Sequence, residues 1–100
     1  MLKNKCKKIT FELKGLPEIQ YNCHCDDCKN FTGSSYASFL AYKKENILVS
    51  GAKPKEYMIT LPDGKRSTNE FCKDCGSGLF HRAPDSFDLI SIKLGSLENF

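Results

Sequence analysis

The chain has 100 residues and a net charge of +3, from 15 basic and 12 acidic side chains. We expect residues 1–100 to form a single small domain, whose hydrophobic core alone gives only marginal stability. Nucleic-acid-binding domains usually carry a stronger and more clustered positive charge, so the composition argues against that class. No apolar run approaches the roughly 18 residues that span a membrane, which favours a soluble protein without membrane contact.

Short strands are predicted along the first third of the chain. Residues 9–13 alternate between apolar and polar side chains, the pattern of a half-buried strand. A second short strand is expected over residues 18–22. The segment Asp26–Lys29 is expected to form a single helical turn, in which an aspartate accepts hydrogen bonds from free backbone amides. Thr32-Gly33-Ser34 is expected to end that turn.

The rest of the chain also indicates strands. We expect them at residues 35–42, 47–49, 79–80 and 87–94, and a hairpin of residues 56–60 and 65–71. The hairpin is predicted because Leu61-Pro62-Asp63-Gly64 has the proline and glycine of a reverse turn. The core is expected to contain four aromatic side chains, which are Tyr36, Phe39, Phe80 and Phe87. The predicted fold class is all-β.

Six cysteines in so short a chain indicate either a disulfide framework or metal binding. Residues 1–8 lack the apolar core of a secretory signal peptide, and this argues against the disulfides of an exported protein. We therefore expect a cytoplasmic protein, in which the thiols stay reduced and free to bind a metal.

Cys23, Cys25 and Cys28 are spaced as C-x-C-x-x-C. One tight loop with this spacing can direct three sulfurs at a single ion, and zinc bonded to sulfur at about 2.3 Å is the natural occupant. Three thiolates leave one position of a tetrahedral ion open. Water, a substrate thiol or a distant side chain can fill it. A purely structural site with a fourth ligand from elsewhere is the less favoured reading.

Cys72 and Cys75 form a second unit, C-x-x-C followed by Gly76. A thioredoxin-like redox motif has the same spacing but needs a following helix, and none is predicted here. The six thiols divide in two ways. Spacing alone favours one ribbon of Cys25, Cys28, Cys72 and Cys75, which leaves two thiols unused. The alternative is two sites, one formed by Cys23, Cys25 and Cys28 and the other by Cys6, Cys72 and Cys75.

A family resemblance covers nearly the whole chain. It is carried by Cys23-His24-Cys25-Asp26-Asp27-Cys28, Thr32-Gly33-Ser34, Phe71-Cys72-Lys73-Asp74-Cys75-Gly76, Leu79-Phe80 and Leu94-Gly95-Ser96-Leu97. In these motifs the chain resembles the glutathione-dependent formaldehyde-activating enzyme family, also called the CENP-V/GFA family. The resemblance implies a small Mss4-like zinc-binding β-domain of short antiparallel strands.

The resemblance also implies two zinc ions. Family members hold a catalytic zinc with three thiolates and a structural zinc with four. Carried over to this chain, the catalytic ligands are Cys23, Cys25 and Cys28, and the structural ligands are Cys6, Cys72 and Cys75. The fourth structural cysteine of the family falls at Asn4. An Asn4 oxygen or a His81 nitrogen can replace it, or the site is incomplete.

The implied activity is that of a carbon–sulfur lyase, which joins glutathione or a similar thiol to a small aldehyde such as formaldehyde. The alternative is a non-catalytic, zinc-stapled β-domain that binds a protein or chromatin partner. A homo-oligomer is compatible with either function. Because the chain reaches Phe100 soon after Leu97, we expect it to lack the C-terminal strands that many family members carry.

Overall fold

The computed structural model describes residues 2–83 and 88–98. The fold is all-β, and every pairing between its strands is antiparallel. In chain order the elements are β1 (Leu2–Lys3), β2 (Ile9–Leu13), β3 (Ile19–Cys23), α1 (Asp26–Thr32), β4 (Ala37–Lys43), η1 (Lys44–Asn46), β5 (Ile47–Gly51), β6 (Lys55–Thr60), β7 (Arg66–Phe71), β8 (Gly78–Arg82), β9 (Leu89–Lys93) and η2 (Leu94–Ser96). The η elements are short 3₁₀ helices.

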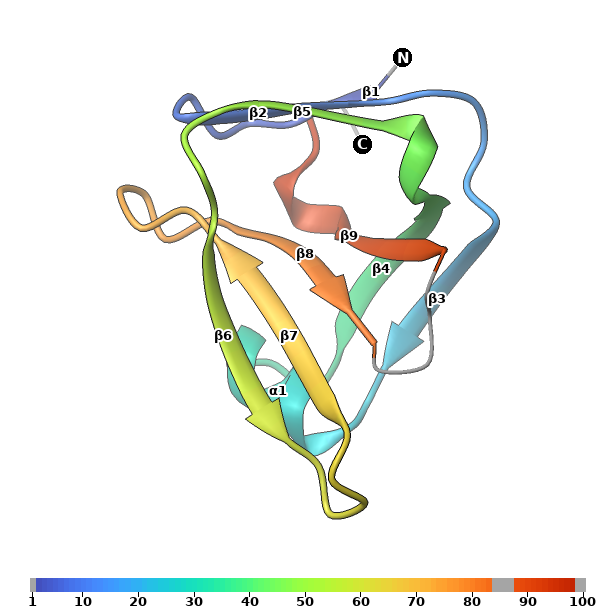
Figure 1. Ribbon diagram of the computed structural model, residues 1–100, viewed down its shortest axis with the longest axis vertical. Helices are drawn as coiled ribbons and strands as arrows, with labels where there is room; N and C mark the ends of the chain where they lie inside the picture. Colours follow the sequence, from blue (N-terminus) through green and yellow to red (C-terminus); the bar gives the residue numbers. More distant parts are fainter. Residues whose placement is uncertain (1, 84–87, 99–100) are drawn as a thin grey trace.

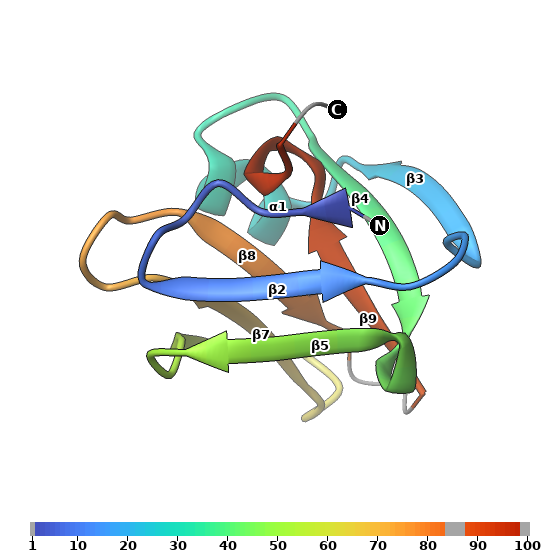
Figure 2. The same ribbon diagram turned by 90° about the horizontal axis from the view of Figure 1, so that it is seen from above.

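The strands form two sheets. A three-stranded sheet has the order β1-β2-β5, and a six-stranded sheet has the order β3-β4-β9-β8-β7-β6. Figure 1 shows the small sheet across the top of the molecule and α1 at the lower end of the large sheet. Seen from above, the small sheet lies in front of the large one, with α1 behind (Figure 2). The large sheet therefore has two differently covered faces.

The main core lies between the two sheets. Ile9, Phe11 and Leu13 of β2 are at most 1% exposed, and they pack with Leu40, Tyr42, Phe80 and Ile92 of the large sheet. The rings of Phe11 and Phe80 lie 4.9 Å apart between centroids. Burying a side chain such as Phe11 contributes about 1.5–3 kcal/mol. The alternation in residues 9–13 thus directs one face of β2 onto the large sheet.

A smaller apolar cluster lies on the opposite face of the large sheet. It contains Ala37 and Phe39 of β4 together with Cys28 of α1. Neighbouring strands add buried polar side chains, which are Ser67, Asn69, Ser91 and Lys93. The pairings Asn69 with His81 and His81 with Ser91 place these residues in one row across β7, β8 and β9. This face of the large sheet therefore carries buried polar side chains beside its apolar cluster.

Most predicted strands are confirmed, with ends displaced by one or two residues. The helix differs, because α1 has seven residues and its N-cap is Cys25 rather than an aspartate. Tyr36 was expected in the core but is 42% exposed, since it precedes β4 in a loop. Phe87, expected in the core and in the last strand, lies outside the described residues. None of the helices in the described segments is long and apolar enough to cross a membrane.

Candidate metal centres

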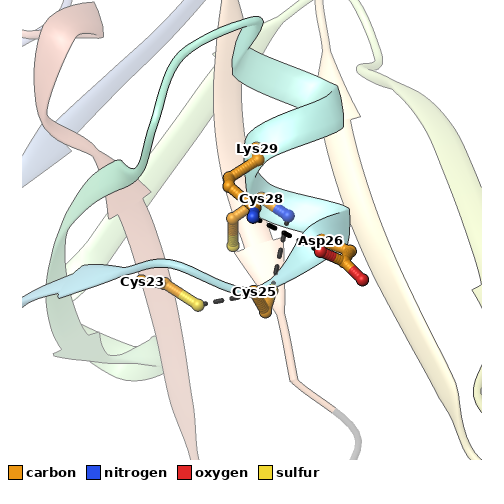
Figure 3. Close-up of polar contacts among 5 residues, drawn as sticks. All are labelled: Cys23, Cys25, Asp26, Cys28 and Lys29. Atoms are coloured by element: carbon orange, nitrogen blue, oxygen red, sulfur yellow. Dashed lines mark hydrogen bonds and ion pairs between the residues drawn. The ribbon is translucent and has the colours of Figure 1, made fainter.

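Two cysteine clusters form in the structure, and the first contains Cys23, Cys25 and Cys28. Cys23 is the last residue of β3, Cys25 precedes α1, and Cys28 lies in the first turn of α1. Their three sulfur atoms lie within 4.8 Å of one another, and those of Cys23 and Cys25 are 3.4 Å apart. Figure 3 shows Cys23 and Cys28 directing their side chains toward Cys25 below the start of the helix.

The local sequence explains this loop. The Cys25 sulfur accepts a hydrogen bond from the Cys28 backbone amide at 3.4 Å, which caps the helix. Asp26 and Asp27 in the first turn complement the positive end of the helix dipole. The helix ends at Gly33, whose φ of 67° is the left-handed conformation that glycine adopts easily. The chain thus enters and leaves a two-turn helix with the three sulfurs at its start.

The sulfur spacing of this first cluster fits one metal ion. Tetrahedral zinc with bonds of about 2.3 Å separates its sulfur ligands by about 3.8 Å. The separations here, from 3.4 Å to at most 4.8 Å, bracket that value.

Burial raises the pKa of the Cys28 thiol, and the nearby Cys23 and Cys25 thiols raise it further. Burial also opposes ionisation of Cys25, but hydrogen bonds from Cys28 and Cys23 outweigh it and lower the pKa of Cys25.

The second cluster contains Cys6, Cys72 and Cys75. Their sulfurs also lie within 4.8 Å of one another, and those of Cys75 and Cys6 are 3.5 Å apart. Cys72 and Cys75 lie in the turn between β7 and β8, where the Gly76 amide donates to the Cys72 carbonyl at 2.8 Å. Cys6 precedes β2, and its sulfur accepts a hydrogen bond from the Ile9 amide. This spacing also fits one tetrahedral zinc ion.

The structure brings the six cysteines together as two groups of three, as in the second of the two divisions drawn from the sequence. The four-thiolate ribbon is not formed, because Cys25 and Cys28 lie in a different group from Cys72 and Cys75.

Asn4 uses both ends of its side-chain amide within the protein. Its Nδ2 donates to the Ile9 carbonyl at 2.6 Å, and its Oδ1 accepts from the Phe11 amide at 3.0 Å. The side chain is buried and fastens the N-terminal segment to β2. The sequence-based hypothesis was that this oxygen could be a metal ligand. In the structure it instead accepts a hydrogen bond from the backbone.

His81 lies on the face of the large sheet that carries the first cluster. Its ring stacks on Phe39, with centroids 5.5 Å apart, and Phe39 packs with Cys28. Its Nε2 is 2.8 Å from the Ser67 hydroxyl. Among the described residues, the metal-ligating groups around Cys6 do not include His81. The sequence-based alternative of a His81 ligand for Cys6, Cys72 and Cys75 is therefore not supported.

Comparison with protein families matches residues 3–100 to the family described as glutathione-dependent formaldehyde-activating enzyme. The chain belongs to this family. A crystal structure of a Rhodobacter sphaeroides protein has a similar fold, with a TM-score of 0.74 and 16% sequence identity over 98% of this chain and 89% of that chain. A sequence identity of this size indicates a similar fold and nothing about function. A search of curated proteins found no significant match.

In this family member a cleft of about 730 Å³ lies near both clusters, and none of the six cysteines is among its lining residues. Its wall includes Phe31 and Thr32 of α1, Ala37 of β4, Gly78 of β8 and Lys93 of β9. Ala37 pairs with Cys23 across the β3–β4 ladder and packs with Cys28, so Ala37 connects this wall to the first cluster. The second cluster is also near this cleft, since Phe71, Gly76 and Ser77 line it next to Cys72 and Cys75 in the chain, but Cys6 and Cys72 themselves belong to the main apolar core.

A buried polar network lies behind the first cluster, and the sequence reading missed it. Asp27 accepts hydrogen bonds from Ser67 and Asn69, each at 3.4 Å. Asn69 in turn accepts from the Lys93 ammonium at 3.0 Å. Burial lowers the pKa of Lys93 to about 8, although negative charge on Cys28 and its neighbours acts the other way. The one available signal was Ser67 and Asn69 alternating within a predicted strand.

Proposed function

We propose that Cys23, Cys25 and Cys28 hold a catalytic zinc ion at which a thiol such as glutathione reacts with a small aldehyde such as formaldehyde. The observation that carries this proposal is the convergence of three sulfurs at the start of α1, where Ala37 packs with the cluster and also lines a cleft of about 730 Å³. The family to which the chain belongs is named for that reaction. The reaction class is carbon–sulfur lyase.

The surroundings of the two clusters suggest different roles. Cys6 and Cys72 are buried in the main core, where an ion would join the segment before β2 to the β7–β8 turn. We assign a structural zinc to that cluster. Cys25 is exposed at the start of α1, and its cluster packs with Ala37, which lines the cleft, so a ligand from solvent can reach it. Cys75 is exposed as well, but Cys6 and Cys72 of its cluster are both buried, whereas Cys28 is the one buried member of the first cluster. We assign the catalytic zinc to this cluster.

Zinc bound by three thiolates would supply a Lewis acid that keeps a fourth, incoming thiol deprotonated at neutral pH. Cys23, Cys25 and Cys28 would hold that ion, and Phe31 and Ala37 of the cleft wall would contact the body of the thiol. The thiolate sulfur would then form a bond to the aldehyde carbon, while the π bond of the aldehyde C=O group breaks and its electron pair moves to the oxygen. The oxygen takes up the proton that the thiol lost, which gives an S-hydroxymethyl product and balances the reaction.

Thiol binding tests the proposal. Glutathione titrated calorimetrically into the zinc-loaded protein should bind saturably, and elemental analysis should give up to two zinc ions per chain. Product formation from glutathione and formaldehyde, followed by NMR, should exceed the spontaneous rate. Cys25→Ser should abolish binding and leave most of the fold intact, because the Cys25 side chain is exposed.

Cys75→Ser is the matched control, because it also removes an exposed cysteine but from the second cluster. It should retain saturable thiol binding. Absence of thiol binding in fully zinc-loaded protein would contradict the proposed enzymatic function. It would favour the alternative, a zinc-stapled domain that binds a protein or chromatin partner. Binding without rate enhancement would keep the thiol site and discard formaldehyde as the substrate.

A further inference from the structure

Lys93 is a buried cation beside the first cysteine cluster. The residue is 8% exposed, lies at the end of β9 and contributes to the wall of the cleft. Its ammonium donates one hydrogen bond to Asn69 and lies over the rings of Phe31 and Phe39, at 4.4 Å and 4.7 Å from their centroids. A buried charge is costly unless an opposite charge is near. Asp27, which is joined to Lys93 through Asn69, is one such charge, and the cysteine centre would be a second.

The lysine is held in place by its surroundings. An added Cβ at Gly78 would lie 2.9 Å from the Lys93 Cδ and 3.0 Å from the Phe31 ring, so the missing side chain leaves room for both. Asn69 accepts from Lys93 and donates to Asp27, which fixes its amide orientation. Lys93 is thus connected through Asn69 to the helix that carries Cys28.

Charge counting gives the lysine a role. Three thiolates around one divalent ion carry a net charge of −1, and a bound substrate thiolate makes it −2. Phe39 lies under the Lys93 ammonium and packs with Cys28, so the cation is next to the centre that would carry this charge. Asp27 also faces Lys93 through Asn69, and it is negative like the centre.

We propose that Lys93 is the counter-ion of the Cys23, Cys25 and Cys28 centre and makes it selective for an anionic ligand. It is a positioning residue that lets the fourth ligand bind as a thiolate. This inference rests on the proposed function, since it presupposes a metal ion held by the three cysteines. It adds a determinant of ligand charge that the cysteine motif does not contain.

The test compares ligands of different charge on the full-length, cobalt(II)-loaded protein. Binding of 2-mercaptoethanol, which binds a metal as its thiolate, and of neutral imidazole is followed in the visible spectrum. Lys93→Met should weaken thiolate binding by about tenfold or more, because a nearby unit charge is lost from a site of low dielectric. Imidazole binding should change by less than about twofold, because a neutral ligand gains little from the cation.

Two further variants make the result specific. Lys93→Gln can still donate a hydrogen bond to Asn69 but has no charge, so it should behave like Lys93→Met. Lys29→Met removes a lysine that is exposed on α1 and paired with Asp26 at 3.4 Å, and it should leave both affinities within about twofold of wild type. Melting temperatures of the zinc-loaded variants check that each is folded.

Equal losses for both ligands would show that Lys93 only shapes the cleft, and would overturn the inference. Unchanged thiolate binding in both Lys93 variants would also overturn it. If the wild-type protein binds cobalt(II) at Cys23, Cys25 and Cys28 but no thiolate, or binds no metal there, the proposed function itself fails. The two kinds of failure are therefore distinguishable.

Discussion

Single buried polar side chains in this fold make hydrogen bonds to backbone groups that apolar residues of the same size cannot make. Asn4 is the clearest case, because it makes two hydrogen bonds to backbone groups of β2 while only 5% exposed. Removing it leaves the Ile9 carbonyl and the Phe11 amide without these partners. A buried backbone group that loses its partner costs about 1–3 kcal/mol.

We expect Asn4→Ala to lower the free energy of unfolding by about 2 kcal/mol or more. Urea denaturation of the zinc-loaded protein measures this change. Lys5→Ala is the control, since Lys5 is exposed and its backbone bond to Ser96 survives the substitution. A loss for Asn4→Ala no larger than that of the control would mean that these two hydrogen bonds contribute nothing.

Gly78 offers a second test at this scale. We expect Gly78→Ala to lower the free energy of unfolding by about 1–3 kcal/mol, because the new methyl group would overlap the Lys93 stem and the Phe31 ring. Gly95 lies in the same cleft and has open space around it, so Gly95→Ala should change stability by less than about 0.5 kcal/mol. Equal effects of the two substitutions in denaturant unfolding would contradict this account.

At the scale of elements, the second cysteine cluster joins segments that are far apart in the sequence. Cys6 stands before β2 in the small sheet, whereas Cys72 and Cys75 stand in the β7–β8 turn of the large sheet. An ion held by these three sulfurs would therefore tie the two sheets together. Metal binding of this kind contributes directly to folding free energy in a small domain.

We expect Cys75→Ser to lower the melting temperature of the zinc-loaded protein by about 10 °C or more, since loss of about 2 kcal/mol has that effect in a domain of this size. Lys73→Ser alters another exposed residue of the same turn and should leave the melting temperature nearly unchanged. With a chelator present, Cys75→Ser should melt like the wild type. A difference that persists in chelator would show that Cys75 stabilises the fold without metal.

The strands and the cysteine pattern could be predicted from the sequence because their signals are local. Alternation over residues 9–13 and the turn at residues 61–64 each specify an element within a few positions. β1 was missed because its two residues are too short to show a period. The pairing of Lys93 with Asn69 was missed because it depends on which strands become neighbours, and the order β9-β8-β7 is a property of the whole sheet.

At the scale of the whole molecule, the polar face of the large sheet makes stability depend on pH. Burial lowers the pKa of His81 below its ordinary value of 6.5, and the positive charge of Lys93 lowers it further, while Asp27 has the opposite effect. The unfolded chain therefore takes up a proton at higher pH than the folded protein does. The contribution of uncharged His81 to the free energy of unfolding is therefore fully present above about pH 6.5. It is lost as the pH falls below that value.

We expect the wild type to lose more stability than His81→Gln between pH 7.5 and 5.5, by about 1 kcal/mol, since one unit below the unfolded pKa corresponds to about 1.4 kcal/mol. Glutamine does not titrate and can keep a hydrogen bond to Ser67. Zinc release at low pH affects both proteins, so the difference between their urea-unfolding curves isolates His81. Parallel pH profiles for wild type and His81→Gln would mean that protonated His81 is accommodated in the fold.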